Sequence, residues 1–265
     1  MTSNTKLIIS IGTCIALLMP FGAQATAITN IAISGTGSYT IYELPNPPVV
    51  GPQILELVTP PTLAAVNDIL KDNTRVGNVQ LGKPSEPSLE KFLTVTFAGG
   101  TQAIFSNLLK TDWTDNGDAL IKSYITAAAQ SVGKTLDSTQ MGNAVTKFLT
   151  VWELASDPSI AKIDLVNGRI VVGQDGLLNP ADYLTNLLGV TAPPNSQASE
   201  AVKVTYAGST QYLYSFSASR TGYSTADTVS YTGRYIAQTP EPTTLLLLSV
   251  GFMGLGYMRR HNKRN

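Results

Sequence analysis

Residues 28–240 contain neither cysteine nor histidine, because the single cysteine, Cys14, and the single histidine, His261, lie near the two ends of the chain. No disulfide can hold this stretch, so its fold must depend on a hydrophobic core, which about 213 residues suffice to bury. The missing side chains also exclude Ser-His-Asp and Cys-His catalysis, zinc sites of His and Cys, and haem or iron–sulfur ligation by these residues. Carboxylates, hydroxyls and lysine remain for chemistry, together with oxygen ligands that suit Ca²⁺ or Mg²⁺.

The charge of residues 28–240 is mildly acidic. This stretch has 13 Lys and Arg against 17 Asp and Glu, a net charge of −4. A surface of that sign does not attract phosphate backbones or anionic lipid headgroups. We therefore expect no nucleic-acid partner.

The N-terminal residues have the pattern of a secretory signal. Lys6 precedes the apolar run Leu7–Leu18, and Ala23-Gln24-Ala25 is a small-x-small cleavage site. We expect residues 1–27 to be a signal peptide that directs the chain to the secretion translocon.

The C-terminal residues also have the pattern of a targeting segment. Pro240-Glu241-Pro242 is followed by an apolar run, Leu245–Met258, and then by Arg259 and Arg260. The run of about 14 residues is short for a membrane span, which needs roughly 20. The cations behind it would stay on the cytoplasmic side. The alternative is a buried C-terminal helix, which the adjacent basic cluster disfavours.

This tail resembles the PEP-CTERM sorting signal of Gram-negative bacteria, through Pro240, Glu241, Pro242, the apolar run and the pair Arg259 and Arg260. The resemblance implies that exosortase, a membrane protease, is a partner. It also implies transient anchoring in the inner membrane by the tail, followed by transfer to the cell surface or release. We therefore divide the chain into a signal peptide (1–27), an exported α+β domain (28–239) and a sorting tail (240–265).

The exported domain is itself similar to an uncharacterised, mainly cyanobacterial family of PEP-CTERM proteins. The segments that carry this resemblance are residues 155–160, 200–206 and 212–218. The family implies no known activity.

Hydrophobic patterning predicts the elements of the exported domain. Strand-type runs at 28–33 and 39–42 flank a glycine-rich turn, and residues 76–81 resemble an edge strand. Helical spacing follows at 117–131 and 138–155, and another helix ends near Leu188. Asn167-Gly168 between two β-type runs is a strong hairpin signal. Strands return after residue 202. This order predicts an α+β fold, with antiparallel β-hairpins at both ends and a helical central segment.

Two segments of the chain resemble each other. Residues 93–106 and 202–215 are identical at seven of 14 positions, and both have a strand-turn-strand pattern. We interpret them as two similar hairpins of one sheet; the alternative is an ancient duplication.

One acidic cluster has the composition of a cation site. Asp112, Asp115, Asn116 and Asp118 crowd around Gly117, and such oxygen ligands suit Ca²⁺. The spacing of an EF-hand is absent, and acids at the start of a helix also cap its free N–H groups. A calcium site at Asp112, Asp115 and Asp118 is therefore the weaker interpretation. A second, still weaker set comprises Asp175, Asn179 and Asp182.

The function that these observations favour is that of an exported, non-enzymatic surface or matrix protein, which the PEP-CTERM resemblance links to exopolysaccharide and biofilm. One alternative is a secreted carbohydrate-active hydrolase that uses two carboxylates. Another is a calcium-dependent adhesive module. The C-terminal part is rich in tyrosines, which can stack on sugars but are also ordinary strand formers: Tyr206, Tyr212, Tyr214, Tyr223, Tyr231 and Tyr235.

Overall fold

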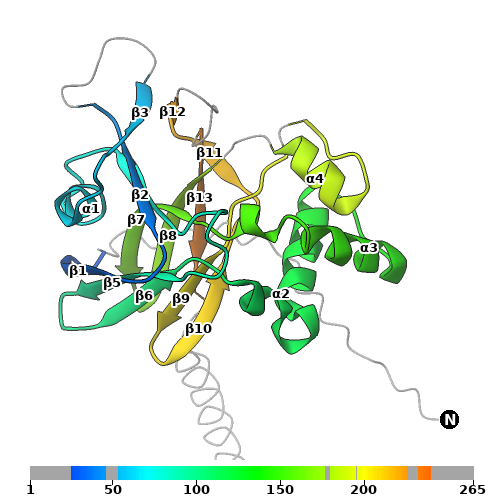
Figure 1. Cartoon of the computed structure of the whole chain (residues 1–265), viewed down its shortest axis with the longest axis horizontal. Coiled ribbons are helices and arrows are strands. Elements are labelled where there is room, and N and C mark those ends of the chain that lie inside the picture. Colours follow the sequence, from blue (N-terminus) through cyan, green and yellow to red (C-terminus); the bar gives the residue numbers. More distant parts are fainter. Residues whose placement is uncertain (1–24, 46–52, 177–179, 195, 226–231, 240–265) are drawn as a thin grey trace, which may run out of the picture.

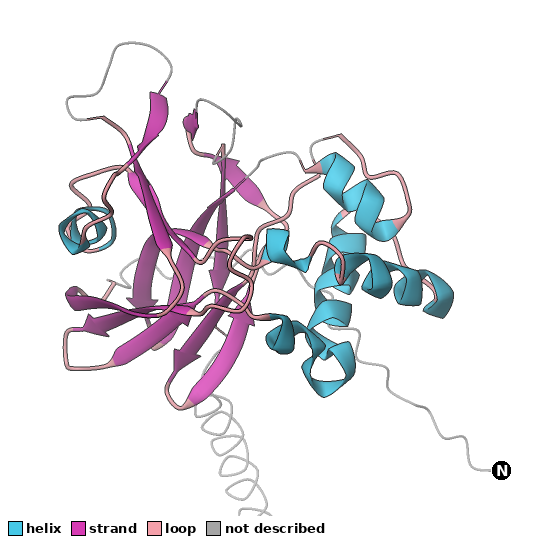
Figure 2. Ribbon diagram, viewed as in Figure 1, coloured by secondary structure: helices cyan, strands magenta, loops and turns pink. Residues whose placement is uncertain are grey.

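The computed structural model describes residues 25–45, 53–176, 180–194, 196–225 and 232–239 (Figure 1). Of these residues, 37% are in strands and 27% in helices, so the fold is mostly β. The strands form two sheets, and most of the helices gather beside them (Figure 2).

The first sheet has five strands in the order β1-β5-β6-β9-β10, and all its neighbours are antiparallel. Its two hairpins are the segments that resemble each other in sequence, and β6 of one pairs with β9 of the other. The interpretation as two hairpins of one sheet is therefore confirmed. The bounds are β1 Ile28–Gly35, β5 Lys91–Phe97, β6 Gln102–Ser106, β9 Val202–Tyr206 and β10 Ser209–Leu213.

The second sheet has eight strands in the order β11-β13-β8-β7-β4-β2-β3-β12. Asn167 and Gly168 have φ of 53° and 76°, so they form the predicted tight turn between β7 and β8. The short strand β12 pairs parallel to β3. The bounds are β2 Tyr39–Glu43, β3 Gln53–Leu57, β4 Gly77–Leu81, β7 Ser159–Val166, β8 Arg169–Gly176, β11 Ala218–Arg220, β12 Tyr223–Thr225 and β13 Gly233–Gln238.

Apolar side chains of both sheets share one core. Val95 and Phe105 of the first sheet pack in the same buried cluster as Val79 and Ile163 of the second. Helix α1 (Leu63–Leu70) adds Val66 and its neighbours to this cluster. The sheets are therefore held together by hydrophobic burial, as the absence of cysteine requires.

A second core lies within a cluster of helices, which occupies the right of Figure 1. We call α2 (Lys110–Ser131), α3 (Ser138–Phe148), the 3₁₀ turn η1 (Trp152–Ala155) and α4 (Ala181–Leu188) the helical cluster. Its centre is Trp113, which contacts Phe148 with ring centroids 4.6 Å apart. No helix among the described residues is long and apolar enough to cross a membrane.

The predicted helical-centre α+β fold is wrong. The middle of the chain contributes β4 to β8 to the sheets, so strands outnumber helices there as well as at the ends. The sequence patterns at 76–81, at 93–106 and around Asn167-Gly168 predicted strands in the middle of the chain, but not that these strands join those of the two ends in two sheets. Strand β4, with four of its five residues buried, lies inside its sheet and is not the predicted edge.

The predicted first hairpin is also wrong, because β1 and β2 belong to different sheets. The glycine-rich segment between them crosses from one sheet to the other. Gly35 has a φ of +89°, and a Cβ atom there would lie 2.4 Å from the carbonyl oxygen of Glu90. The glycine thus permits a close backbone approach instead of a hairpin turn.

Candidate functional site

The residues predicted to direct export lie outside the described residues. These are most of the signal peptide and the tail residues Pro240, Glu241, Pro242, Arg259 and Arg260. Apart from residues 25–27, the described residues belong to the predicted exported domain.

Asp112 lies in a network of hydrogen bonds and ion pairs. Its Oδ2 accepts the backbone N–H of Leu109 at 2.8 Å, the capping contact that was the alternative to a metal site. Its Oδ1 accepts the Tyr212 hydroxyl at 3.0 Å and lies 3.0 Å from Lys203 Nζ. Lys203 also pairs with Glu90 at 3.0 Å. These contacts join α2 to β9 and β10.

Asp115 and Asp118 lie at an interruption within α2. Residues 115–118 have non-helical backbone angles, and Asn116, Gly117 and Asp118 have positive φ. Asp115 is exposed and Asp118 half-buried, whereas Asp112 is buried. Within the described ranges, no group of three or more His, Cys, Asp and Glu side chains is placed to hold a metal. A calcium site at Asp112, Asp115 and Asp118 stays an untested prediction.

The second set of predicted oxygen ligands is also dispersed. Asn179 lies outside the described residues, and Asp182 is in the first turn of α4. Asp175 is fully buried, and its carboxylate pairs with Arg234 at 2.7 Å and 3.1 Å. The Tyr223 hydroxyl donates to the same carboxylate at 2.6 Å. This network joins β8, β12 and β13, and sequence spacing could not reveal it.

Two carboxyl groups, on the buried Asp157 and the half-buried Glu200, form the site that sequence reasoning missed. Asp157 Oδ2 accepts the Gln80 amide at 2.8 Å, and Glu200 Oε2 accepts the Ser159 N–H at 3.1 Å. Burial raises the pKa of Asp157 to about 7. Burial, and then the nearby Asp157 charge, raises the pKa of Glu200 well above its usual value. The only signal in the sequence was an acid next to the apolar run that begins at Ala201.

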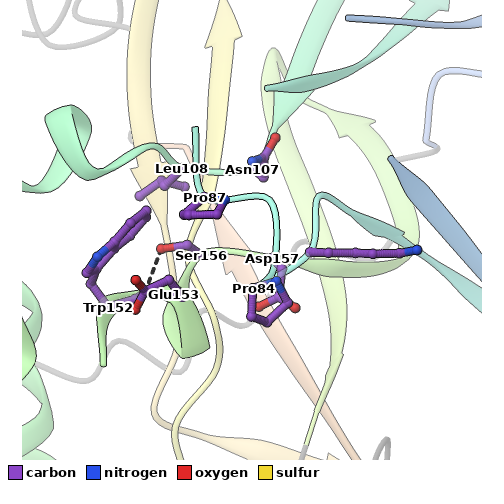
Figure 3. A pocket seen from close by; sticks show the side chains of 9 residues that line it. Pro84, Pro87, Asn107, Leu108, Trp152, Glu153, Ser156 and Asp157 are labelled. Carbon is purple, nitrogen blue, oxygen red and sulfur yellow. Dashed lines mark hydrogen bonds between the residues drawn. The ribbon is translucent and has the colours of Figure 1, made fainter. Parts of the chain in front are cut away.

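A small pocket lies beside Asp157, and Figure 3 shows the side chains that line it. Pro84, Pro87, Trp152 and Asp157 are among its lining residues. Its volume is about 10 Å³, roughly the space of one water molecule.

A larger, open groove of about 460 Å³ lies between β10 and β13. Its lining carries no charge. One buried amide oxygen, Oε1 of Gln211, has no hydrogen-bond partner. The hydroxyls of Tyr212 and Tyr214 are held on the helical cluster by Asp112 and by Ser123 of α2. The lining residues are Gln211, Tyr212, Leu213, Tyr214, Ile236, Ala237 and Gln238.

Comparison with known proteins gives one match, at the C-terminus. A protein-family model described as the PEP-CTERM protein-sorting motif matches residues 238–260. No curated protein and no solved structure matches the chain. The similarity of residues 28–239 to a cyanobacterial family is therefore not supported by any relative. The motif implies processing by exosortase and export with sorting at the membrane before the cell surface.

Proposed function

We propose that the chain is a non-catalytic surface protein that associates with the exopolysaccharide of its own cell and binds it through the groove between β10 and β13. The sorting motif at residues 238–260 supports delivery to the surface. The groove is the observation that carries the binding role, because it is open, has a volume of about 460 Å³ and is lined by residues that suit sugars.

Three properties of the groove favour a neutral glycan. First, the lining residues are all uncharged, so neither an anionic nor a cationic ligand would gain an ion pair there. Second, Tyr212 and Tyr214 are half-buried and line the groove, so the exposed part of each ring can contact sugar C–H groups. The Tyr214 ring also packs against Tyr124 and Phe216. Third, the side-chain amides of Gln211 and Gln238 line the groove, and amide groups can both donate hydrogen bonds to sugar hydroxyls and accept them.

The hydrolase alternative would place its chemistry at two carboxyl groups that flank a sugar. Asp157 and Glu200 are two carboxyl groups whose charges repel each other, which makes them the candidates for this role. The pocket beside Asp157 has a volume of about 10 Å³, far below the volume of a sugar ring. A pocket this small supports a structural role for the two carboxyl groups and favours sugar binding in the groove between β10 and β13.

We expect the double variant Gln211→Ala and Gln238→Ala to bind the host polysaccharide at least about tenfold more weakly than the native domain, because each lost hydrogen bond is worth about 1 kcal/mol. Affinity electrophoresis or calorimetry measures this. Gln102→Ala is the matched control: Gln102 is exposed on β6 of the same sheet and lies outside the groove lining.

Equal affinity of the double variant and the native domain would contradict the groove as the binding site. Absence of binding by the native domain would contradict the polysaccharide as the ligand. Release of reducing ends from the polysaccharide, lost in Asp157→Asn, would favour the hydrolase.

A further inference from the structure

Residues 155–159 connect the helical cluster to both sheets. The carbonyl of Ala155 accepts the N–H of Ala201 at 2.9 Å, just before β9. The carbonyl of Ser156 accepts Leu108 N–H at 3.0 Å, just after β6, and that of Pro158 accepts Leu81 N–H at 3.1 Å, at the end of β4. We call residues 155–159 the seam.

The carboxyl pair sits on this seam. Glu200 binds Ser159 at one end of it, and Asp157 lies within it and binds Gln80 of β4. Tyr124 of α2 and Tyr235 of β13 also lie near Glu200. Their hydroxyls are already engaged, since Tyr124 donates to the Ser199 carbonyl at 2.9 Å and Tyr235 accepts the Ala198 N–H at 3.2 Å.

The charged side chains beside Asp157 form no ion pair with it or with Glu200. Lys83 and Glu153 line the pocket beside Asp157. Among the ion pairs between described residues, none includes Asp157 or Glu200. Ionisation of both carboxyls would therefore place two mutually repelling negative charges on the buried Asp157 and the half-buried Glu200, with no cation paired to either.

The direction of the pH effect follows from the raised pKa values of the two groups. The folded state holds these protons more tightly than the unfolded chain, so the stabilisation is complete below the unfolded pKa of about 4. It is lost as the pH rises through the raised folded pKa values of the two groups, which for Asp157 is about 7. Acid therefore favours the closed seam.

We propose that Asp157 and Glu200 form a proton-operated latch, which holds the helical cluster on the sheets while the pair is protonated and loosens the seam when both groups ionise. The helical cluster carries the anchors of Tyr212 and Tyr214, so opening would also disturb the groove. That consequence rests on the proposed function, whereas the latch does not.

Amide hydrogen exchange followed by mass spectrometry tests the latch. After correction for intrinsic exchange rates, the N–H groups of Leu81, Leu108 and Ala201 should be at least about tenfold less protected at pH 8.5 than at pH 5.5. The variant Glu200→Gln, which resembles the protonated form in shape and hydrogen bonding, should keep protection at both pH values. The double variant with Asp157→Asn should do the same.

Glu153→Gln is the matched control, because Glu153 lines the same pocket and is half-buried, and it should retain the pH response of the native protein. Protection that is independent of pH in the native protein, or a pH response that persists in the double variant, would overturn the latch. Polysaccharide binding measured at pH 5.5 is a separate readout: its absence would contradict the proposed function and leave the latch standing.

Discussion

Replacement of Trp113 by alanine is expected to lower the free energy of unfolding by about 3–5 kcal/mol, the usual cost of removing a fully buried indole. Trp113 is 0% exposed, and its ring contacts Phe148 and Tyr124. Its N–H also donates to the Ser156 hydroxyl at 2.7 Å, which ties the centre of the helical cluster to the seam. The variant loses both the packing and this connection.

Two further variants separate these contributions. Trp113→Phe keeps an aromatic ring but removes the donor to Ser156, so a smaller loss of about 1–2 kcal/mol is expected. Leu154→Ala, at an apolar side chain that is 57% exposed, should change the free energy of unfolding by less than about 0.5 kcal/mol. Urea unfolding followed by the helical circular dichroism signal measures all three. A loss below about 1 kcal/mol in Trp113→Ala would contradict the packing described for the helical cluster.

Replacement of Arg234 by alanine is expected to cost about 3 kcal/mol, because it leaves the fully buried Asp175 carboxylate without its cation. Burial raises the pKa of Asp175, and Arg234 and Tyr223 oppose that rise. Without Arg234 the folded state should hold a proton on Asp175 to a higher pH. The destabilisation should therefore grow as the pH rises from about 5 to about 8.

A second substitution distinguishes a buried charge from lost packing. In the double variant Asp175→Asn and Arg234→Met no charge remains buried, so part of the loss should be recovered and its pH dependence should disappear. Arg75→Ala is the matched control, since the Arg75 side chain is 36% exposed in its pair with Glu43, and it should be much less destabilising than Arg234→Ala. Equal effects of Arg234→Ala and Arg75→Ala would contradict the assignment.

Local sequence signals predicted the elements well where the structure is local. The Asn167-Gly168 turn, the hairpin of β5 and β6, and α4 with Gly189 behind it in a left-handed conformation all follow from nearby residues. Apolar spacing likewise located α3, but the single helix predicted at 138–155 is in fact α3 followed by the separate 3₁₀ turn η1. These features depend on turn chemistry and helical period, which a short segment contains in full.

Long-range pairing was not predictable in the same way. The segment around Gly35 has the residues of a hairpin turn, yet β1 pairs with β5, more than fifty residues later. The electrostatic interaction of Asp157 with Glu200 and the ion pair of Asp175 with Arg234 join residues 43 and 59 positions apart, respectively. One chain without relatives carries no signal for such contacts, so the carboxyl pair could not be chosen from 17 acids.

The intact mass of the native protein, measured after fractionation of its own cells, tests whether the chain is exported and processed at its C-terminal tail. We expect a mature form that lacks residues 1–27 and the tail beyond about residue 240, found at the cell surface or in the medium. A protein that retains residues 240–265 and stays in the inner membrane would contradict exosortase sorting.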